Sequence, residues 1–514
     1  MGFEQAHTSS GDVRQQFQAF WCTASSDCGF ICNQMRLDSR EWPERLGTEQ
    51  STQQRGERMQ ILIKNGRLLD PESGTDRVTD ILIEDGNVTD IGDDLKLPAP
   101  KKRETGKVVG AGDDIVSDES RIIDASGCWV TPGFVDLHVH LRDPGLTYKE
   151  DIGTGSEAGA HGGFTTICAM PNTKPVIDTP DKLNYVRFKA AALSPIHVMQ
   201  IGAITYGQKG EQLADISGMV DAGAPAISED GKSVMDARVA REAFRLAAHL
   251  GIPVCAHCED KNLVHGGVVN DDANAIRLKL PGITNSTEDV ITARDLVLAA
   301  ETGAHLHLCH VSTAGAVQMI RMAKANGVHV TAEVCPHHFT MTSDDIRTDN
   351  PQYKMNPPLR TPADRDALIE ALKDGTIDCI ATDHAPHAAN EKFGSILTAA
   401  FGIVGLETAL PLAIVRLVEP GILSPLELIR RMSTNPAKAF NLMDEYGDGR
   451  IAVGNPADIV VIDPNEEWII DKKKFASKGR NTPFDGWKVR GRVKCTICDG
   501  ELVYKDGGFD FAKP

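Results

Sequence analysis

The middle of this 514-residue chain alternates eight short apolar segments with longer stretches that carry apolar residues at helical spacing. Stretches such as 236–251 and 313–327 have the period of an amphipathic helix and end in Gly. Eight repeats of strand and helix are typical of a parallel (β/α)8 TIM barrel, an α/β fold. We therefore predict a strand in each of the segments 134–140, 164–170, 196–205, 224–230, 252–258, 304–311, 328–336 and 377–384.

The two ends of the chain have a different pattern from the middle. Segments 60–70 and 80–92 resemble short strands with Asn-Gly and Asp-Gly turns, and similar β-rich segments return at 449–464 and 489–507. This arrangement predicts a small β-sandwich domain assembled from both chain ends. We place this domain at 59–128 and 448–514, and the barrel at 129–447.

Residues 1–58 are rich in Gln, Ser, Arg and Glu and show no sustained period, so we expect a disordered N-terminal extension. Cys22, Cys28 and Cys32 lie there without a His cluster, which argues against a metal site. The polar stretch 93–122 is predicted to be a surface loop.

Composition narrows the class of protein. A net charge of −18 argues against a nucleic-acid or anionic-membrane partner, and no apolar run reaches the roughly 18 residues that span a bilayer. The N-terminus lacks a basic region followed by an apolar one, so we expect no secretory signal. The twelve cysteines are scattered, several of them in apolar strand-like segments, which favours reduced thiols in the cytoplasm.

The predicted strand ends are unusually rich in metal-ligating residues. In barrels of this kind the C-terminal strand ends carry the catalytic groups. His138 and His140 end the first strand and share one face, because side chains alternate along a strand. A lone HxH, or one buried His, is more often structural, so the prediction rests on the joint placement. The other strand ends carry Asp230 on the fourth strand, His257 on the fifth, His310 on the sixth and Asp383 on the eighth.

Four imidazoles and a shared carboxylate suit two borderline divalent ions, most naturally zinc. Two such ions can share a hydroxide that is available near neutral pH. Asp383 is then the natural general base, which takes the proton from this hydroxide and delivers it to a leaving nitrogen.

Two segments, DLHVHLRDPG (136–145) and ATDHAPH (381–387), resemble the signatures of dihydroorotases in the amidohydrolase superfamily. The resemblance extends over roughly residues 59–505. Other segments that are similar to the bacterial type I dihydroorotases are MPNT (170–173), AHCED (256–260), CHVST (309–313), CPHH (335–338), KMNPPLR (354–360) and FGIVGLETALP (401–411).

This resemblance implies a zinc-dependent cyclic amidohydrolase with two Zn²⁺ per subunit, which interconverts N-carbamoyl-L-aspartate and L-dihydroorotate in pyrimidine biosynthesis. It implies that His138 and His140 bind one ion and His257 and His310 the other. Asp230 would bridge the ions, where relatives use a carboxylated lysine. The remaining implied roles are Asp383 as catalytic acid/base and metal ligand, and Arg142, Asn172, Asn356 and His387 around the substrate carboxylate.

Two alternatives stay open. Another cyclic amidohydrolase, such as a dihydropyrimidinase, hydantoinase or allantoinase, would share the HxH motif and the final Asp. Such enzymes usually carry a lysine on the fourth strand and do not need Arg142, Asn172 and Asn356. An inactive homologue that partners a carbamoyltransferase should have lost ligands, and this chain keeps them. We expect a homo-oligomer, with aspartate carbamoyltransferase as a candidate partner.

Several other groups are interpreted as structural or secondary. Lys232 lies past the end of the fourth strand, and Glu229 has the opposite parity from Asp230, so neither is favoured as the bridge. Packing or structural roles are expected for Cys255 with Cys258 and for His337 with His338. The lone Cys495-x-x-Cys498 motif is weak evidence for a zinc site or redox chemistry.

Overall fold

The structure, a computed structural model, describes residues 60–98, 120–443, 447–507 and 509. The predicted N-terminal extension and most of the predicted 93–122 loop lie outside the described residues. Within the described part of the chain, no helix is long and apolar enough to cross a membrane. The nine cysteines there are buried and form no disulfide, as expected for reduced thiols.

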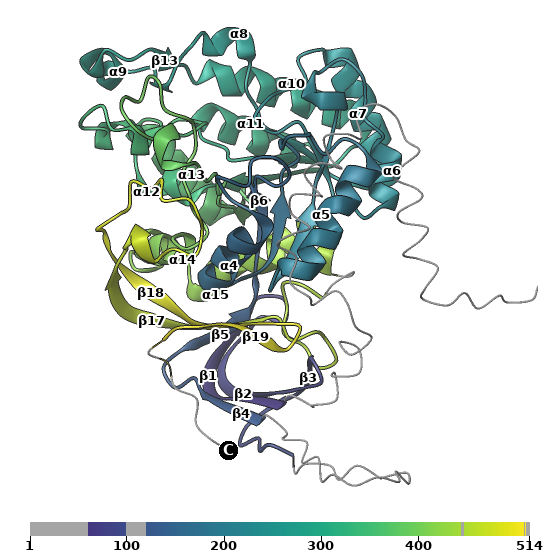
Figure 1. Ribbon diagram of the computed structural model, residues 1–514, viewed down its shortest axis with the longest axis vertical. Helices are drawn as coiled ribbons and strands as arrows, with labels where there is room; N and C mark the ends of the chain where they lie inside the picture. The colour runs from purple at the N-terminus through teal and green to yellow at the C-terminus, as the bar shows by residue number, and fades with distance from the viewer. Residues whose placement is uncertain (1–59, 99–119, 444–446, 508, 510–514) are drawn as a thin grey trace, which may run out of the picture. The chain divides into compact units, whose positions relative to one another are not determined.

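Both ends of the chain contribute strands to one mixed sheet (Figure 1). Its order is β19 (Glu501–Lys505), β18 (Lys488–Cys498), β17 (Ile459–Ile469), β5 (Trp129–Pro132), β1 (Gln60–Asp70), β2 (Thr75–Glu84) and β3 (Asn87–Gly92), with β4 (Ser120–Asp124) also paired to β1.

These strands are recorded as one continuous sheet, and residues of its two halves share one hydrophobic core, so the two facing layers of a β-sandwich stay a prediction. The sheet is continuous through β1, which is long enough to take two partners along one edge. Its first half pairs with β4, its second half pairs with β5, and the register against β2 shifts between Ile63 and Gly66. β5 belongs to this sheet through its pairing with β17, so the sheet extends past the predicted boundary at residue 128. The other domain bounds stay predictions.

Each of the eight predicted strand segments contains a parallel strand. Three form one sheet: β6 (Phe134–Val139), β7 (Phe164–Ala169) and β8 (His197–Gln200). Six form a second: β9 (Gly202–Ala203), β10 (Ile227–Ser228), β11 (Val254–Ala256), β14 (Leu306–Leu308), β15 (Val330–Val334) and β16 (Cys379–Ile380).

Two connections link these sheets. Ile201 alone separates β8 from β9, and its N–H donates to Ala169 O in β7. On the other side Val139 of β6 forms a parallel bridge to His384, just beyond β16. The pairing is recorded in two sheets, and the closed ring of a barrel stays a prediction.

Helices follow most of the parallel strands, and their ends carry the expected signals. In α7 (Ala237–Leu250) the Asp236 carboxylate caps two backbone N–H groups, and Gly251 ends the helix in the left-handed region. This confirms the helix predicted over 236–251. The others are α4 (Ile152–Gly162), α5 (Pro180–Leu193), α6 (Ile216–Asp221), α8 (Lys261–Val264), α9 (Ala273–Leu278), α10 (Ser286–Thr302), α11 (Ala314–Ala325), α12 (Pro336–Thr340), α13 (Pro362–Asp374), α14 (Ala409–Ala413), α15 (Pro425–Ile429) and α16 (Asn435–Ala439), with the short strands β12 (Val269–Asn270) and β13 (Gly282–Ile283).

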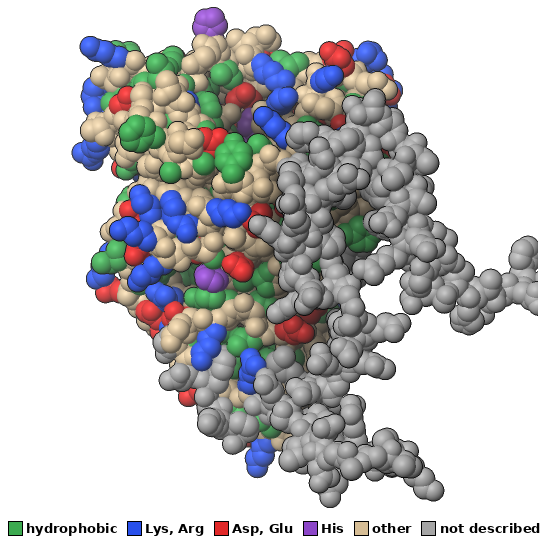
Figure 2. All heavy atoms as spheres, in the orientation of Figure 1, with side chains coloured by type: hydrophobic (Ala, Val, Ile, Leu, Met, Phe, Trp, Pro, Cys, Tyr) green, Lys and Arg blue, Asp and Glu red, His purple; other side chains and the backbone are tan. Residues whose placement is uncertain are grey.

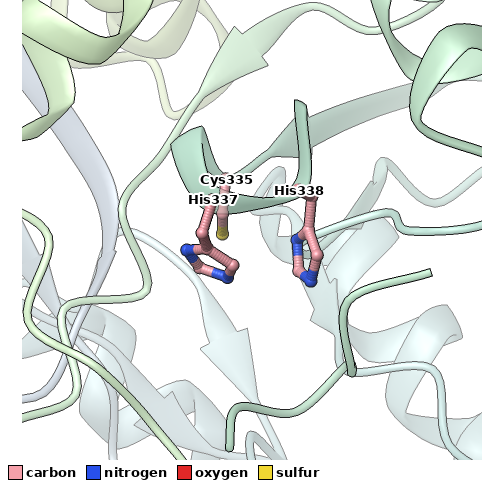
Figure 3. Close-up of side chains that lie close together, drawn as sticks. All are labelled: Cys335, His337 and His338. Carbon is pink, nitrogen blue, oxygen red and sulfur yellow. The ribbon is translucent and has the colours of Figure 1, made fainter. Parts of the chain in front are cut away.

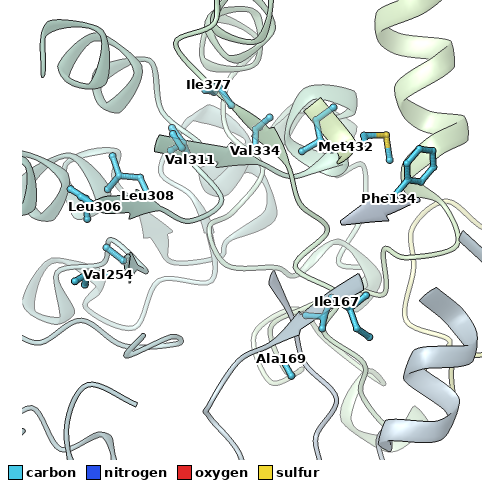
Figure 4. Close-up of a cluster of buried hydrophobic side chains, with 14 of the residues drawn as sticks. Phe134, Ile167, Ala169, Val254, Leu306, Leu308, Val311, Val334, Ile377 and Met432 are labelled. Carbon is cyan, nitrogen blue, oxygen red and sulfur yellow. The ribbon is translucent and has the colours of Figure 1, made fainter. Parts of the chain in front are cut away.

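The main hydrophobic core packs the parallel strands against these helices. Figure 4 shows part of it, with Val254, Leu306 and Val334 on neighbouring strands. Phe134 packs edge to face on Phe164, with ring centroids 5.7 Å apart. At the surface, Lys and Arg side chains are mixed with Asp and Glu on the face in Figure 2. The parallel strands are therefore held in place by their packing against the helices, and their C-terminal ends can carry polar groups.

Candidate metal centre and active site

The six residues predicted as metal ligands all lie at the C-terminal ends of parallel strands. His138 is in β6, His140 follows it directly, and His257 follows β11 directly. The other three come from the segments just after β10, β14 and β16. All are buried, with exposed fractions of 0–7%, and they are His138, His140, Asp230, His257, His310 and Asp383.

Asp230 lies at the centre of this group. Its Oδ1 is 3.2 Å from His138 Nε2, 3.7 Å from His257 Nδ1 and 3.9 Å from His310 Nε2. Its Oδ2 is 3.5 Å from His140 Nε2. The Asp230 carboxylate therefore contacts imidazoles of both predicted ligand pairs. Its Oδ1 lies near one histidine of the first pair and both histidines of the second. We call these six residues the strand-end cluster.

Asp383 lies in the cluster beside the two histidines of the first strand. Its Oδ1 lies 3.0 Å from His140 Nε2 and 3.6 Å from His138 Nε2. Burial opposes the charged form, but the hydrogen bond with His140 and the charges of the imidazoles lower the pKa of Asp383 to about 2. Its φ of 47° is rare for a residue other than Gly, and backbone bonds of the next two residues hold the segment. Asp383 is therefore ionised at neutral pH.

The buried polar atoms of the cluster are incompletely satisfied. His138 Nε2, Asp230 Oδ1 and His257 Nε2 have no hydrogen-bond partner among the described residues. Such atoms are costly in a protein interior unless something binds them. Two triads bring ligand atoms within 4.8 Å of one another, His138 with Asp230 and His310, and His138 with His140 and Asp383. The donors fit a metal ion, so the strand-end cluster is a candidate metal centre.

Glu333 in β15 is a candidate supporting residue of the cluster that sequence reasoning missed. It is fully buried, and its Oε1 accepts from His138 Nδ1 at 2.8 Å and from the His310 backbone N–H. Its Oε2 lies 3.0 Å from His307 Nε2. A carboxylate on the far nitrogen of a ligating imidazole fixes its tautomer and orientation. An acid inside the apolar segment VTAEV was the available signal, because an unpaired buried charge is rare.

We expect Glu333→Gln to lower zinc affinity about 10- to 100-fold, because His138 loses the carboxylate that orients it. Competition with a chelator of known affinity would measure this change. Glu370→Gln on the exposed face of α13 is the matched control, since Glu370 is outside the cluster. Equal zinc affinity in both variants would remove Glu333 from the site.

The four predicted substrate residues lie around the same strand ends, but three of them have partners in the protein. The Asn172 side-chain oxygen accepts a hydrogen bond from His140 Nδ1 at 2.9 Å, and its nitrogen donates to Asp230 Oδ2 at 3.0 Å. Asn172 therefore orients two residues of the cluster. Asn356 donates to Glu259 at 2.6 Å. His387 Nε2 donates to Phe401 O at 2.7 Å.

Arg142 differs from the other three. Its Nε donates to Pro386 O, and the structure records no hydrogen bond from its two terminal nitrogens to a described residue. Those nitrogens are the pair that binds a carboxylate in a bidentate manner. The geometry thus favours Arg142 as the anion-binding group.

The alternative bridging residues point elsewhere. Lys232 Nζ donates to Gln208 O at 3.1 Å. Glu229 accepts from the backbone N–H and the hydroxyl of Thr205. Both are engaged away from the imidazoles, which leaves Asp230 as the carboxylate of the fourth strand in the cluster.

A second group of possible ligands lies on α12, which follows β15. Figure 3 shows the His337 and His338 rings with the sulfur of Cys335 beside them, all three buried. His337 Nε2 and His338 Nδ1 lack a described partner, and His338 Nε2 donates to Pro357 O. The structure shows this proximity, and the structural role predicted for the two histidines stays a prediction.

Comparison with solved structures identifies the class. The fold is similar to the L-hydantoinase (dihydropyrimidinase) of Arthrobacter aurescens, with a TM-score of 0.73 and 28% identity, covering 87% of this chain and 97% of that one. It is equally similar to the D-hydantoinase (dihydropyrimidinase) of a Thermus species, with a TM-score of 0.73 and 27% identity over 88% and 97% of the chains. This fold and the buried cluster at its strand ends define a cyclic amidohydrolase.

Sequence relatives identify the family. A family model described as dihydro-orotase-like matches residues 127–316. The dihydroorotase of Syntrophotalea carbinolica is 46% identical over 447 residues, 87% of this chain and 99% of that protein, and the dihydroorotase of Geobacter metallireducens is also 46% identical, covering 87% and 100%. The chain belongs to the dihydroorotase family, as its signature segments predicted.

Proposed function

We propose that this chain catalyses the reversible ring closure of N-carbamoyl-L-aspartate to L-dihydroorotate in de novo UMP synthesis. The observation that carries this proposal is the strand-end cluster, in which Asp230 contacts four buried imidazoles whose ligand atoms converge. The identity of 46% to dihydroorotases, against 27–28% to hydantoinases of known structure, supports the choice among cyclic amidohydrolases.

We propose two Zn²⁺ ions as the cofactor. His138 and His140 would hold one, His257 and His310 the other, and Asp230 would bridge them. Imidazole and carboxylate donors suit zinc, and neutral histidines bind best. Burial, together with the nearby charges of His257 and His138, lowers the pKa of His310 to about 3, so this ring offers a free lone pair at neutral pH. When bound, the ions would activate water as a nucleophile near neutral pH and polarise the scissile carbonyl.

The chain's own residues would bind the substrate and move the proton. In the hydrolytic direction the C–N bond of the ring amide breaks, and its nitrogen must gain a proton. Asp383 would accept the proton of the attacking water and pass it to that nitrogen. Arg142, with Asn172, Asn356 and His387 nearby, would hold the carboxylate of the substrate. The reverse sequence closes the ring.

Absorbance-monitored hydrolysis of dihydroorotate beside hydantoin, dihydrouracil and allantoin tests the proposal. We expect turnover of dihydroorotate well above that of the other three. Preference for a substrate without the carboxylate would assign the chain to another cyclic amidohydrolase. No turnover despite bound zinc would favour the inactive homologue.

Because Asp230 is the proposed bridging ligand, we predict that activity does not require bicarbonate. A carboxylated lysine forms from carbon dioxide, whereas Asp230 is a permanent anion with two oxygens. Zinc-free protein should regain equal activity when zinc is added with or without bicarbonate. Asp230→Ala should lose bound zinc, and the matched variant Lys232→Ala should keep it. A bicarbonate requirement, or zinc loss from Lys232→Ala alone, would contradict the assignment.

The wider setting is also proposed. The bridge between Val139 and His384 and the continuity of β8 with β9 support a closed (β/α)8 barrel. We propose that the enzyme works in the cytoplasm as a homo-oligomer, with aspartate carbamoyltransferase as a candidate partner and no nucleic-acid or membrane partner.

A further inference from the structure

A third group of ligand-type side chains lies away from both the strand-end cluster and the α12 group. It is at the opposite ends of the strands from the strand-end cluster. His197 is the first residue of β8, Asp458 directly precedes β17, and Cys498 is the last residue of β18. Ligand atoms of these three residues all lie within 4.8 Å of one another. The catalytic cluster follows the C-terminal ends of the parallel strands, so the two groups are distinct.

Strand pairing explains this meeting of distant segments. Ile459 of β17 pairs with Ile497 of β18, so Asp458 and Cys498 are neighbours at the open end of that ladder. The backbone N–H of Gly133 donates to Asp458 O, which ties this end to the strand that leads into β6. Thr166 of β7 pairs with His197, which brings the imidazole to the same place.

The distances between the donors suit an ion. His197 Nε2 lies 3.1 Å from Asp458 Oδ2, close to the separation of two ligands on one tetrahedral ion with bonds of about 2.0–2.2 Å. Cys498 Sγ lies 3.8 Å from Thr165 O and also interacts with the His197 imidazole. The His197 side chain is 21% exposed, which gives an ion a path to the group.

A fourth residue, Asp448, places an unpartnered carboxylate oxygen near this group. Asp448 is 1% exposed, and its Oδ2 has no hydrogen-bond partner among the described residues, while Oδ1 accepts from Thr166. Buried carboxylates that repel one another require a proton or a cation between them.

The charge balance points the same way. Asp448, Asp458 and Asp499 surround a single imidazole, and Asp499 Oδ1 is 3.7 Å from His197 Nε2. The ion pairs recorded for the described residues include no Lys or Arg partner for these three carboxylates. An imidazole, a thiol and carboxylates together select a borderline ion over Mg²⁺ or Ca²⁺.

We propose that His197, Asp458 and Cys498, with the buried Asp448 carboxylate nearby, form a structural Zn²⁺ site that ties the mixed sheet to the parallel strands. Binding displaces the thiol proton of Cys498, which the fold otherwise retains. The site joins segments about 40 to 300 residues apart in the chain, so bound zinc stabilises the native arrangement.

Metal content gives the first test. Cys498→Ser should hold one zinc equivalent per chain less than the unmodified protein. The matched control is Cys495→Ser, which removes a buried thiol from the opposite face of the same strand and should keep the full content. This difference does not depend on how many ions the catalytic cluster binds. Equal zinc content in the two variants would overturn the proposal.

Cobalt gives a signature that a mere folding defect would not produce. Zinc-free protein loaded with Co²⁺ should show a near-ultraviolet thiolate-to-cobalt band, because the proposed catalytic ligands include no thiolate. The band should persist in Cys495→Ser and disappear in Cys498→Ser. A band that persists in Cys498→Ser would assign the thiolate elsewhere and refute the site.

Asp448→Asn tests the site without removing the thiol. If zinc binds here, loss of the nearby negative charge weakens its binding, and the melting temperature of the zinc-loaded protein should fall. If the carboxylates share only a proton, relief of their repulsion should raise the melting temperature without changing zinc content. That second result would overturn the proposal, and dihydroorotate turnover at low temperature should be retained in either case.

Discussion

Asp383→Asn is expected to reduce dihydroorotate turnover by roughly 10²- to 10⁴-fold, the usual loss when a positioned acid/base is removed. The amide keeps the size of the side chain but cannot accept the proton that ring opening and closure require. Four imidazoles and Asp230 remain, so the variant should retain two zinc ions per chain. Rate and zinc content should be measured on the same preparation.

The matched control is Asp378→Asn, an identical change just before β16. Asp378 binds Lys324 at 2.7 Å and accepts the Ala332 N–H, away from the strand-end cluster. Its variant should keep turnover at a permissive temperature. Near-normal turnover of Asp383→Asn would remove this residue from the mechanism, and loss of both zinc ions would make it a structural ligand instead.

Arg142→Met should weaken dihydroorotate binding by about 2–5 kcal/mol, because the substrate carboxylate loses a desolvated partner. Zinc content should stay unchanged, since the guanidinium touches no atom of the four histidines in the recorded contacts. The ratio of kcat/KM for dihydroorotate to that for a ring amide without a carboxylate should collapse.

Arg142→Lys is the graded control. It keeps the charge but loses the planar pair of donors, so its effect should lie between that of Met and the unmodified protein. If affinity for dihydroorotate is the same in all three proteins, another residue holds the carboxylate. Lys149, which contacts His387 Nδ1 at 3.4 Å, would be the next residue to test.

Much of the site was predictable because the relevant signals are local. A strand has a period of two residues, so an apolar segment that ends in His138-Val139-His140 defines both a strand and the face of its final side chains. The same holds for the segments that end near Asp230, His257 and His310. The helix over 236–251 was equally accessible, because its cap and its terminal Gly are sequence features.

Contacts between distant segments were not predictable in the same way. Glu333 lies 195 residues from His138, and its strand β15 pairs with β14 and β16 rather than with β6, so only the packing of the whole fold brings its carboxylate to the imidazole. Asn172 was assigned to the substrate, yet its amide bonds to His140 and Asp230. The change of partner along β1, which helps to join strands from both chain ends into one sheet, also had no local signal.

The sequence by itself therefore determined which residues stand at the strand ends and what chemistry they offer, since side-chain parity and composition are properties of each segment alone. The tertiary structure decided which of them meet, what supports them from behind, and that His197, Asp458 and Cys498 lie together. The physical reason is that strand pairing and core packing are set by the whole chain, and no single segment specifies its neighbours in space.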